Sequence, residues 1–164
     1  MSYVFDSSSL IYLGKIKILD KIKFLEGKKF IPKNVYEEVI NRGIEKEEPE
    51  AIYIKELIED NIFIVKETKI GFDNIEHLSY ADKEVLSLAN ETESTAIIDE
   101  IYARNIANNY KIKNHGTIFV LLSLLKKKII TKIETKKYLD NIIKFGFYVS
   151  AELYGETLKL IDKM

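Results

Sequence analysis

The chain has 164 residues, of which 46% are hydrophobic and 31% charged, and its formal net charge is −1. This length suits one domain with a substantial core, and this composition excludes a disordered chain. The near-zero charge excludes a strong basic field that attracts nucleic acid from a distance, so a nucleic-acid site would depend on local cations, a partner or a second subunit. Because cysteine is absent, disulfides and thiolate metal sites are excluded.

The first half of the chain predicts short apolar strands that alternate with helices. Strands are expected at Tyr3–Phe5, Lys29–Ile31 and Ile62–Val65. The expected helices begin at Ser7–Ser9, resume over Ile16–Leu25, run from Pro32 to about Gly43, and cover Ala51–Ile58. The segment Lys66–Leu78 lacks clear periodicity, and a loop of this length beside a candidate site is often functional or mobile.

The second half continues the alternation and ends in helices. A helix from Ser79 or Ala81 precedes a strand at Ser94–Ile98, and a helix from about Glu100 to Asn109 precedes a short last strand at Tyr110–Lys113. Three further helices are expected at about Gly116–Leu125, Thr131–Phe145 and Ser150–Ile161. The alternation predicts an α/β fold, a three-layer α/β/α sandwich around a parallel sheet of four or five strands with right-handed crossovers. We expect one domain over residues 1–164, with the helices from about residue 131 packed on it.

No segment predicts a membrane or export role. The start Met-Ser-Tyr-Val-Phe-Asp lacks the basic and long apolar regions of a signal peptide. The longest apolar candidate, Thr117–Leu125, is far shorter than the roughly 20 residues that span a bilayer. We therefore expect a cytoplasmic protein.

Four acidic residues stand where an α/β sheet binds its ligands. Asp6 and Asp99 follow apolar strands, whereas Glu38 and Asp82 lie early in helices that follow such segments. The carboxyl ends of parallel strands share one edge of the sheet, so these side chains are expected to converge there. Several carboxylates in one place need a cation, and Mg²⁺ and Mn²⁺ prefer oxygen ligands.

Each acid also has a structural explanation. Asp6 can cap the helix that follows it. Asp82 is favoured at a helix start by the helix dipole. Glu38 is expected on the inward side of its helix beside Val35 and Val39, where it needs a partner. The two histidines, His77 and His115, are expected to be surface or loop residues and not metal ligands.

The combined pattern resembles the PIN domain, a family of small metal-dependent ribonucleases. The similar segments recur in the family's order, and the C-terminal part resembles toxin-like prokaryotic members. These segments are Val4–Ile11, Ile31–Val39, Leu78–Ala89, Ile98–Ala107, the pair Gly116-Thr117 and the ending Leu139–Leu153.

The resemblance implies a ribonuclease that uses Mg²⁺ or Mn²⁺ and serves as the toxin of a toxin–antitoxin pair. Its catalytic and metal-binding residues would be Asp6, Glu38, Asp82 and Asp99. Ser7, Ser8, Glu100 and Thr117 would support them, and Arg104 would contact a phosphate unless it forms a salt bridge. One departure is Glu100, which stands where the family often has a second aspartate. We expect an RNA substrate, an antitoxin partner and a homodimer that shares a groove.

Two other functions remain open at this stage. One is a PIN-like module without catalysis that binds RNA or a protein. The other is a phosphotransfer domain, either a phosphatase of the Asp-x-Asp kind or a receiver. Ser8 replaces the second aspartate of such phosphatases, and no lysine clearly follows a late strand as a receiver requires.

Overall fold

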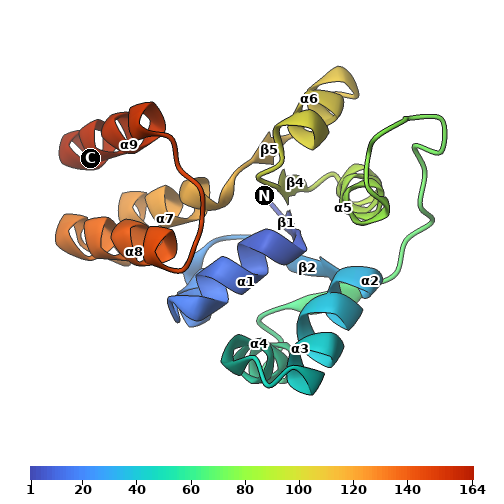
Figure 1. The fold of residues 1–164 in the computed structure, drawn as a ribbon, viewed down its shortest axis with the longest axis horizontal. Helices are drawn as coiled ribbons and strands as arrows, with labels where there is room; N and C mark the ends of the chain where they lie inside the picture. The colour runs from blue at the N-terminus through green and yellow to red at the C-terminus, as the bar shows by residue number, and fades with distance from the viewer.

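The computed structural model describes residues 1–164 and contains one parallel sheet between layers of helices (Figure 1). All neighbouring strands are parallel, in the order β3-β2-β1-β4-β5. The strands are β1 (Tyr3–Phe5), β2 (Lys29–Pro32), β3 (Ile64–Lys66), β4 (Thr95–Ile97) and β5 (Asn114–His115). The predicted three-layer α/β/α fold is therefore confirmed, with five strands.

The helices follow the expected order along the chain. Those of the first half are α1 (Ser7–Lys15), a 3₁₀ segment η1 (Leu19–Phe24), α2 (Lys33–Tyr36), a π-helical turn η2 (Glu37–Asn41), α3 (Arg42–Glu45) and α4 (Pro49–Glu59). Those of the second half are α5 (Tyr80–Glu91), α6 (Ile101–Asn109), α7 (Thr117–Lys126), α8 (Lys132–Lys144) and α9 (Ala151–Lys163). None of them is both long and apolar enough to cross a membrane.

The strand order decides which face each helix covers. The chain moves from β1 through β2 to β3 in one direction, and from β3 to β4 and β5 in the other. Because such crossovers are right-handed, α1 to α4 cover one face and α5 and α6 cover the opposite face. In agreement, α5 packs on β1, β2 and β4. The direction reverses between β1 and β4, and open α/β sheets bind ligands at such a reversal.

The centre of the sheet is fully buried and mostly apolar, which explains why short strands suffice. Every residue of β1 and β4 is buried. Phe5 packs edge-on against Phe63, with ring centres 5.5 Å apart. A parallel sheet covered on both faces requires continuous apolar strands of this kind. The core therefore fixes the carboxyl ends of β1 and β4 side by side.

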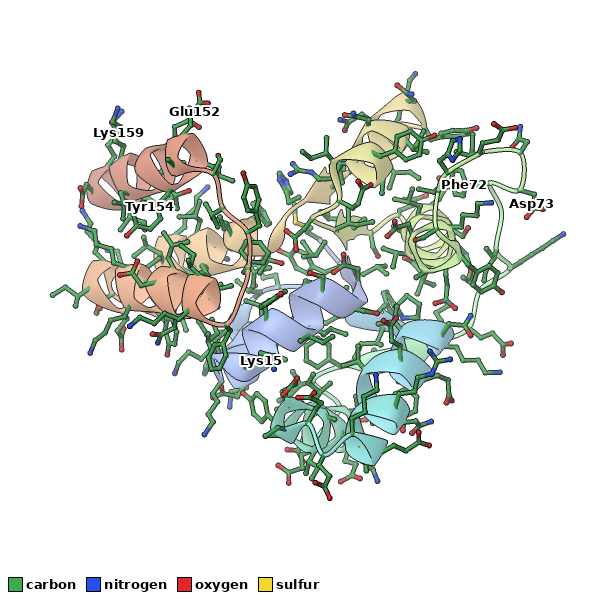
Figure 2. The ribbon with its side chains drawn as sticks, viewed as in Figure 1. Lys15, Phe72, Asp73, Glu152, Tyr154 and Lys159 are labelled. Atoms are coloured by element: carbon green, nitrogen blue, oxygen red, sulfur yellow. The ribbon has the colours of Figure 1, made fainter.

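The C-terminal helices form a stack at one end of the molecule (Figure 1). In this stack α7 packs on η1 and α8, and α8 packs on α1 and α9. Polar side chains join α8 to α9. The Lys136 Nζ lies 2.7 Å from Asp162 Oδ1, and the Tyr154 hydroxyl donates to Asp140 Oδ1 at 2.7 Å. Figure 2 shows Glu152 and Lys159 on the outer side of α9.

Two expected elements were wrong in detail. The last strand lies at Asn114–His115 and not at Tyr110–Lys113, because Lys111 takes a left-handed backbone, with φ of 57°, in the turn that ends α6. The segment Ile16–Leu25 is a turn followed by the 3₁₀ segment η1, since Lys17 also has a left-handed φ of 55°.

Candidate active site

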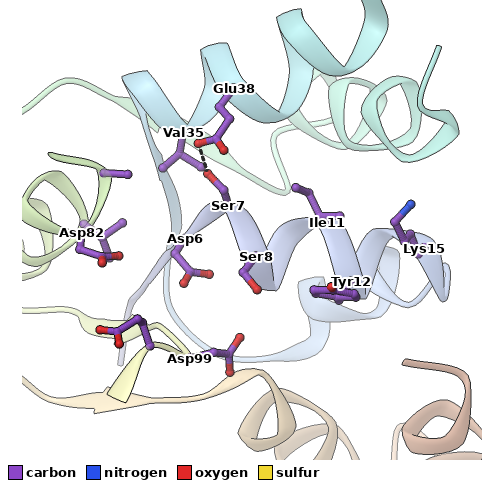
Figure 3. A pocket seen from close by; sticks show the side chains of 13 residues that line it. Asp6, Ser7, Ser8, Ile11, Tyr12, Lys15, Val35, Glu38, Asp82 and Asp99 are labelled. Carbon is purple, nitrogen blue, oxygen red and sulfur yellow. Dashed lines mark hydrogen bonds between the residues drawn. The ribbon is translucent and has the colours of Figure 1, made fainter. Parts of the chain in front are cut away.

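The four acidic residues singled out in the sequence line one pocket at the carboxyl edge of the sheet (Figure 3). The pocket has a volume of about 520 Å³. Other polar side chains that line it are Ser7, Ser8, Glu100 and Lys15, and apolar side chains include Ile11, Val35 and Val85. The structure thus brings together acids that are up to 93 positions apart in the chain, from Asp6 to Asp99.

Asp6 is both a helix cap and a pocket residue. Its backbone N–H donates to the Ile97 carbonyl at 3.1 Å, and its Oδ1 accepts the Ser9 N–H at 2.8 Å, so it begins α1 directly after β1. The side chain is only 8% exposed. Figure 3 shows its carboxylate in the space between Asp82, Ser8 and Asp99.

The surroundings of Asp6 disfavour its negative charge. Burial raises the pKa of Asp6 to about 7, and the charges of Asp99 and Asp82 add to the rise, while hydrogen bonds from Ser9 oppose it. A carboxyl group with this pKa is partly protonated near neutral pH. A cation in the pocket would remove that penalty, because it favours the ionised form.

Asp99 is held by the start of α7. Its Oδ1 accepts the Thr117 backbone N–H at 2.7 Å, and its Oδ2 accepts the Thr117 hydroxyl at 2.5 Å. Gly116 lies so close that a β-carbon there would stand 2.9 Å from Asp99 Oδ1. Thr117 is fully buried and touches the site only through Asp99. The expected Gly-Thr pair therefore orients one acid.

Glu38 differs from its expected placement. It accepts a hydrogen bond from the Ser7 hydroxyl at 2.8 Å, shown dashed in Figure 3, but its side chain is exposed at the edge of the pocket. The expected inward position is wrong because the Glu38 side chain is exposed, although Glu38 does line the pocket together with Val35. The π-helical turn η2 widens the helix at this point, so that Val39 and Ile40 both face the core and Glu38 does not.

Asp82 and Glu100 lie at the starts of two helices. Ser79 caps α5 by accepting the Asp82 N–H at 3.1 Å. Burial raises the pKa of Asp82, and the charge of Glu100 adds to the rise, while the hydrogen bond with Ser79 lowers it. Glu100 itself caps α6 by accepting the Ala103 N–H at 2.7 Å. Glu100 adds negative charge to the pocket, while its Oε2 caps the start of α6.

Comparison with family models places the chain in a known family. A family model described as a PIN domain, DUF3368, matches residues 2–163. The chain belongs to the PIN-domain family. Members of this family commonly have nuclease function, and the match removes the reason for the phosphotransfer alternative. A search of curated proteins found no match.

A solved structure supports the fold of this PIN domain. It is a PilT N-terminus domain protein, SSO1118, from the hyperthermophilic archaeon Sulfolobus solfataricus P2. The two chains are 18% identical and superpose with a TM-score of 0.51 over 76% of this chain and 94% of that one. At this identity the likeness supports the shared fold and carries no information on substrate.

The donor set of the PIN-domain pocket fits a hard divalent cation in its chemistry. The available ligands are carboxylate and hydroxyl oxygens, which suit Mg²⁺ or Mn²⁺. No three acidic or histidine side chains stand close enough together to hold one ion at once. Mg²⁺ keeps several waters and needs only one or two carboxylates directly. Asp6 and Asp99, at the reversal between β1 and β4, are the candidates for that pair.

Arg104 is not among the residues that line the pocket, and it forms no ion pair. Its Nε donates to Asn114 Oδ1 at 3.2 Å, and one terminal nitrogen would be 3.7 Å from a β-carbon at Gly116. The salt bridge considered for it is therefore absent. Beside it, His115 stacks on Phe119 with ring centres 3.8 Å apart, and burial together with the Arg104 charge lowers the pKa of His115. His115 is half-buried in β5, so its expected surface or loop position is wrong, and it is not among the residues that line the acidic pocket.

A buried carboxylate that the sequence did not predict joins two walls of the pocket. Glu84 on α5 is 2% exposed, and its Oε2 accepts both the backbone N–H and the side-chain amide of Asn34, at 3.1 and 2.7 Å. Its Oε1 is buried without a hydrogen-bond partner. Asn34 lies in α2, so this contact links the helix of Asp82 to the segment that leads to Glu38. Nothing in the sequence marks two residues 50 positions apart as partners.

Proposed function

We propose that this PIN-domain protein is a ribonuclease that uses Mg²⁺ or Mn²⁺ to hydrolyse RNA phosphodiester bonds. The observation that carries the proposal is the meeting of Asp6, Glu38, Asp82 and Asp99 in one pocket. Burial, with a smaller contribution from the charges of Asp99 and Asp82, raises the pKa of Asp6 and costs stability at neutral pH, and a site for a divalent cation would account for that cost.

The four acids have two kinds of role in the proposed mechanism. A bound divalent ion supplies charge stabilisation at the phosphate and activates a water near neutral pH. Asp6 and Asp99 would hold the ion, with Asp99 oriented by Thr117. Glu38, oriented by the Ser7 hydroxyl, and Asp82 would bind through water or accept the proton of the attacking water.

Arg104 is the proposed contact for a substrate phosphate near Asp99. Its guanidinium is always charged and has five N–H donors, of which Asn114 occupies one. Because no carboxylate pairs with it, its charge is available to an anion. Arg104→Gln should weaken RNA binding and reduce its dependence on salt.

The direct test is cleavage of single-stranded RNA by the purified protein. We expect cleavage with Mg²⁺ or Mn²⁺, none with excess chelator, and recovery when the ion is restored. Asp99→Asn should abolish cleavage while circular dichroism and unfolding remain native-like. Asp73→Asn, in the exposed loop labelled in Figure 2, is the matched control and should keep full activity. Cleavage by Asp99→Asn, or cleavage that persists in chelator, would contradict the proposal.

A non-catalytic PIN-like module that binds RNA or a protein is the second candidate. Two observations favour it: no three acids can hold one ion together, and Glu100 caps α6 where the family often has a metal-binding aspartate. Calorimetric titration with Mn²⁺ separates the candidates. Absence of heat, together with RNA binding that is unchanged by Asp99→Asn, would support the module.

We further propose that the protein is a cytoplasmic toxin that forms a homodimer and is held inactive by an antitoxin. Large apolar side chains stay exposed at the C-terminal stack, where a partner could cover them: Phe145, Tyr148, Leu153 and Leu160. A specific dimer buries at least roughly 1,200 Å² of surface. Light scattering over a dilution series tests the dimer, and a monomer at every concentration would remove it.

A further inference from the structure

The acidic pocket is lined by five carboxylates and one basic side chain. The lining acids are Asp6, Glu38, Asp82, Asp99 and Glu100, and the single basic side chain among the lining residues is Lys15. An RNA strand carries one phosphate charge per nucleotide. Metal ions bound to the acids can neutralise only the phosphates that lie next to those ions. We propose that Lys15 binds the phosphate next to the one that is cleaved. This inference rests on the proposed ribonuclease function and adds a substrate subsite to it.

The position of Lys15 on α1 fits such a subsite. Ser8, Tyr12 and Lys15 recur at helical spacing and therefore share one face of α1. Seven residues of α-helix place Lys15 about 10 Å along the axis from Ser8. Figure 3 shows Lys15 at the end of the pocket away from Asp6, beyond Tyr12 and Ile11. A strand that leaves the acids along α1 would meet this apolar wall first and the ammonium group next.

The contacts of Lys15 hold it in an ion pair and leave it partly open to solvent. Its Nζ lies 3.2 Å from Glu50 and 3.8 Å from Glu48, on the side of α4. Glu50 is 6% exposed, whereas the side chain of Lys15 is 25% exposed. An ammonium group has three donors, so the Glu50 contact leaves donors for an anion in the pocket. The ion pair fixes the lysine without sealing it from solvent.

A second cavity meets the first one at Lys15. This cavity, of about 640 Å³, is lined by Lys15 together with Lys17, Glu50, Phe145 and neighbouring residues. The Lys15 Nζ lies 5.8 Å from the centre of the Phe145 ring. Lys15 therefore has open space on two sides, unlike an ion-pairing lysine enclosed between helices.

The competing explanation is that Lys15 only neutralises the buried Glu50. Removing a single partner of such a pair leaves an unpaired buried charge and destabilises the protein, so Lys15→Met alone cannot separate the two explanations. The comparison is therefore made in a Glu50→Gln background. There the buried carboxylate is absent, and Lys15→Met removes the lysine without leaving an unpaired charge.

The experiment measures kcat and KM for Mg²⁺-dependent cleavage of a labelled pool of single-stranded RNA. At 0.15 M salt, the KM of the Lys15→Met/Glu50→Gln protein should be about fourfold higher than that of Glu50→Gln. This increase is the contribution to binding that one phosphate contact on a single strand makes at that salt concentration. Its KM should also depend less on salt, with a log–log slope smaller by about 0.7. Lys15→Arg should retain most of the wild-type KM, because it keeps the charge.

Two controls keep the outcomes distinct. Urea unfolding should show equal stability for the two proteins that are compared, and Lys17→Met, which lies outside the acidic pocket, should leave KM unchanged. An unchanged KM and salt slope in the double variant would overturn the Lys15 subsite while the ribonuclease stands. No RNA cleavage by the wild-type protein with any divalent ion would overturn the proposed function and the subsite with it.

Discussion

Thr117 binds both carboxylate oxygens of Asp99, one through its backbone N–H and the other through its hydroxyl. The two hydrogen bonds fix the rotation of the carboxylate, and Thr117 itself is fully buried at the start of α7. Asp99 is thus oriented by an element that follows it by 18 residues. Groups that orient a metal ligand typically change metal affinity or activity 10- to 100-fold when they are removed.

Thr117→Val should reduce Mn²⁺ affinity and RNA cleavage by about tenfold or more, because valine keeps the shape but loses the hydroxyl donor. Calorimetry and initial rates measure the two effects. Thr117→Ser restores the hydroxyl and should recover most of the loss. If Thr117→Val keeps wild-type affinity and rate, the backbone N–H alone orients Asp99.

Gly116→Ala should displace the Asp99 carboxylate, since the added β-carbon would lie 2.9 Å from Oδ1. The backbone at Gly116 is extended, with φ of −91°, so alanine causes no backbone strain and the loss should fall on metal binding and cleavage. Gly155→Ala is the matched control. It lies within α9 with open space around it, and should stabilise the protein by roughly 1 kcal/mol through helix propensity while activity is unchanged.

The buried Asp6 predicts a pH-dependent stability in the absence of divalent ions. Its pKa is about 7 in the folded protein against a usual 3.8, so between these values the folded state keeps a proton that the unfolded state has released. The contribution of Asp6 to the free energy of unfolding therefore falls as pH rises from about 4 to 7, in total by on the order of 4 kcal/mol.

Asp6→Asn should remove this contribution. In chelator, the stability difference between Asp6→Asn and wild type should grow in favour of the variant as pH rises through this window, as measured by urea unfolding at several pH values. Asp73→Asn, on the exposed loop, should track the wild type. Parallel profiles for Asp6→Asn and wild type would show that Asp6 titrates at its usual pKa.

Glu84→Ala should destabilise the protein by about 1–3 kcal/mol, because it removes both hydrogen bonds that the buried Glu84 carboxylate accepts from Asn34. Urea unfolding measures the change. Glu91→Ala on the same helix removes an exposed carboxylate, which lies 3.8 Å from Lys66, and should cost well under 1 kcal/mol. Equal losses in the two variants would mean that the link between α5 and α2 adds nothing to stability.

The sequence was sufficient for the first four strands and for the acids that follow β1 and β4. Asp6 comes immediately after β1 and Asp99 two positions after β4, so the parallel order alone brings them together. Glu38 was placed wrongly because a π-helical turn depends on how its helix packs, which local periodicity does not encode. The contacts of Glu84 with Asn34 and of Lys15 with Glu50 are long-range, and no spacing rule predicts them.

The pairing of β1 with β4 joins Tyr3 to Thr95, across more than half of the chain. Such pairing forms late in folding, because the entropy cost of closing a long loop comes before the stabilisation from the contacts between the paired strands. Asp6 leaves the ribosome early, but Asp99 and its support Thr117 emerge only after the first two-thirds or so of the protein has been made. A nascent chain therefore has no complete set of acids until synthesis is well advanced. If the protein is the proposed ribonuclease, the late pairing of β1 with β4 would delay cleavage of the messenger from which it is being translated.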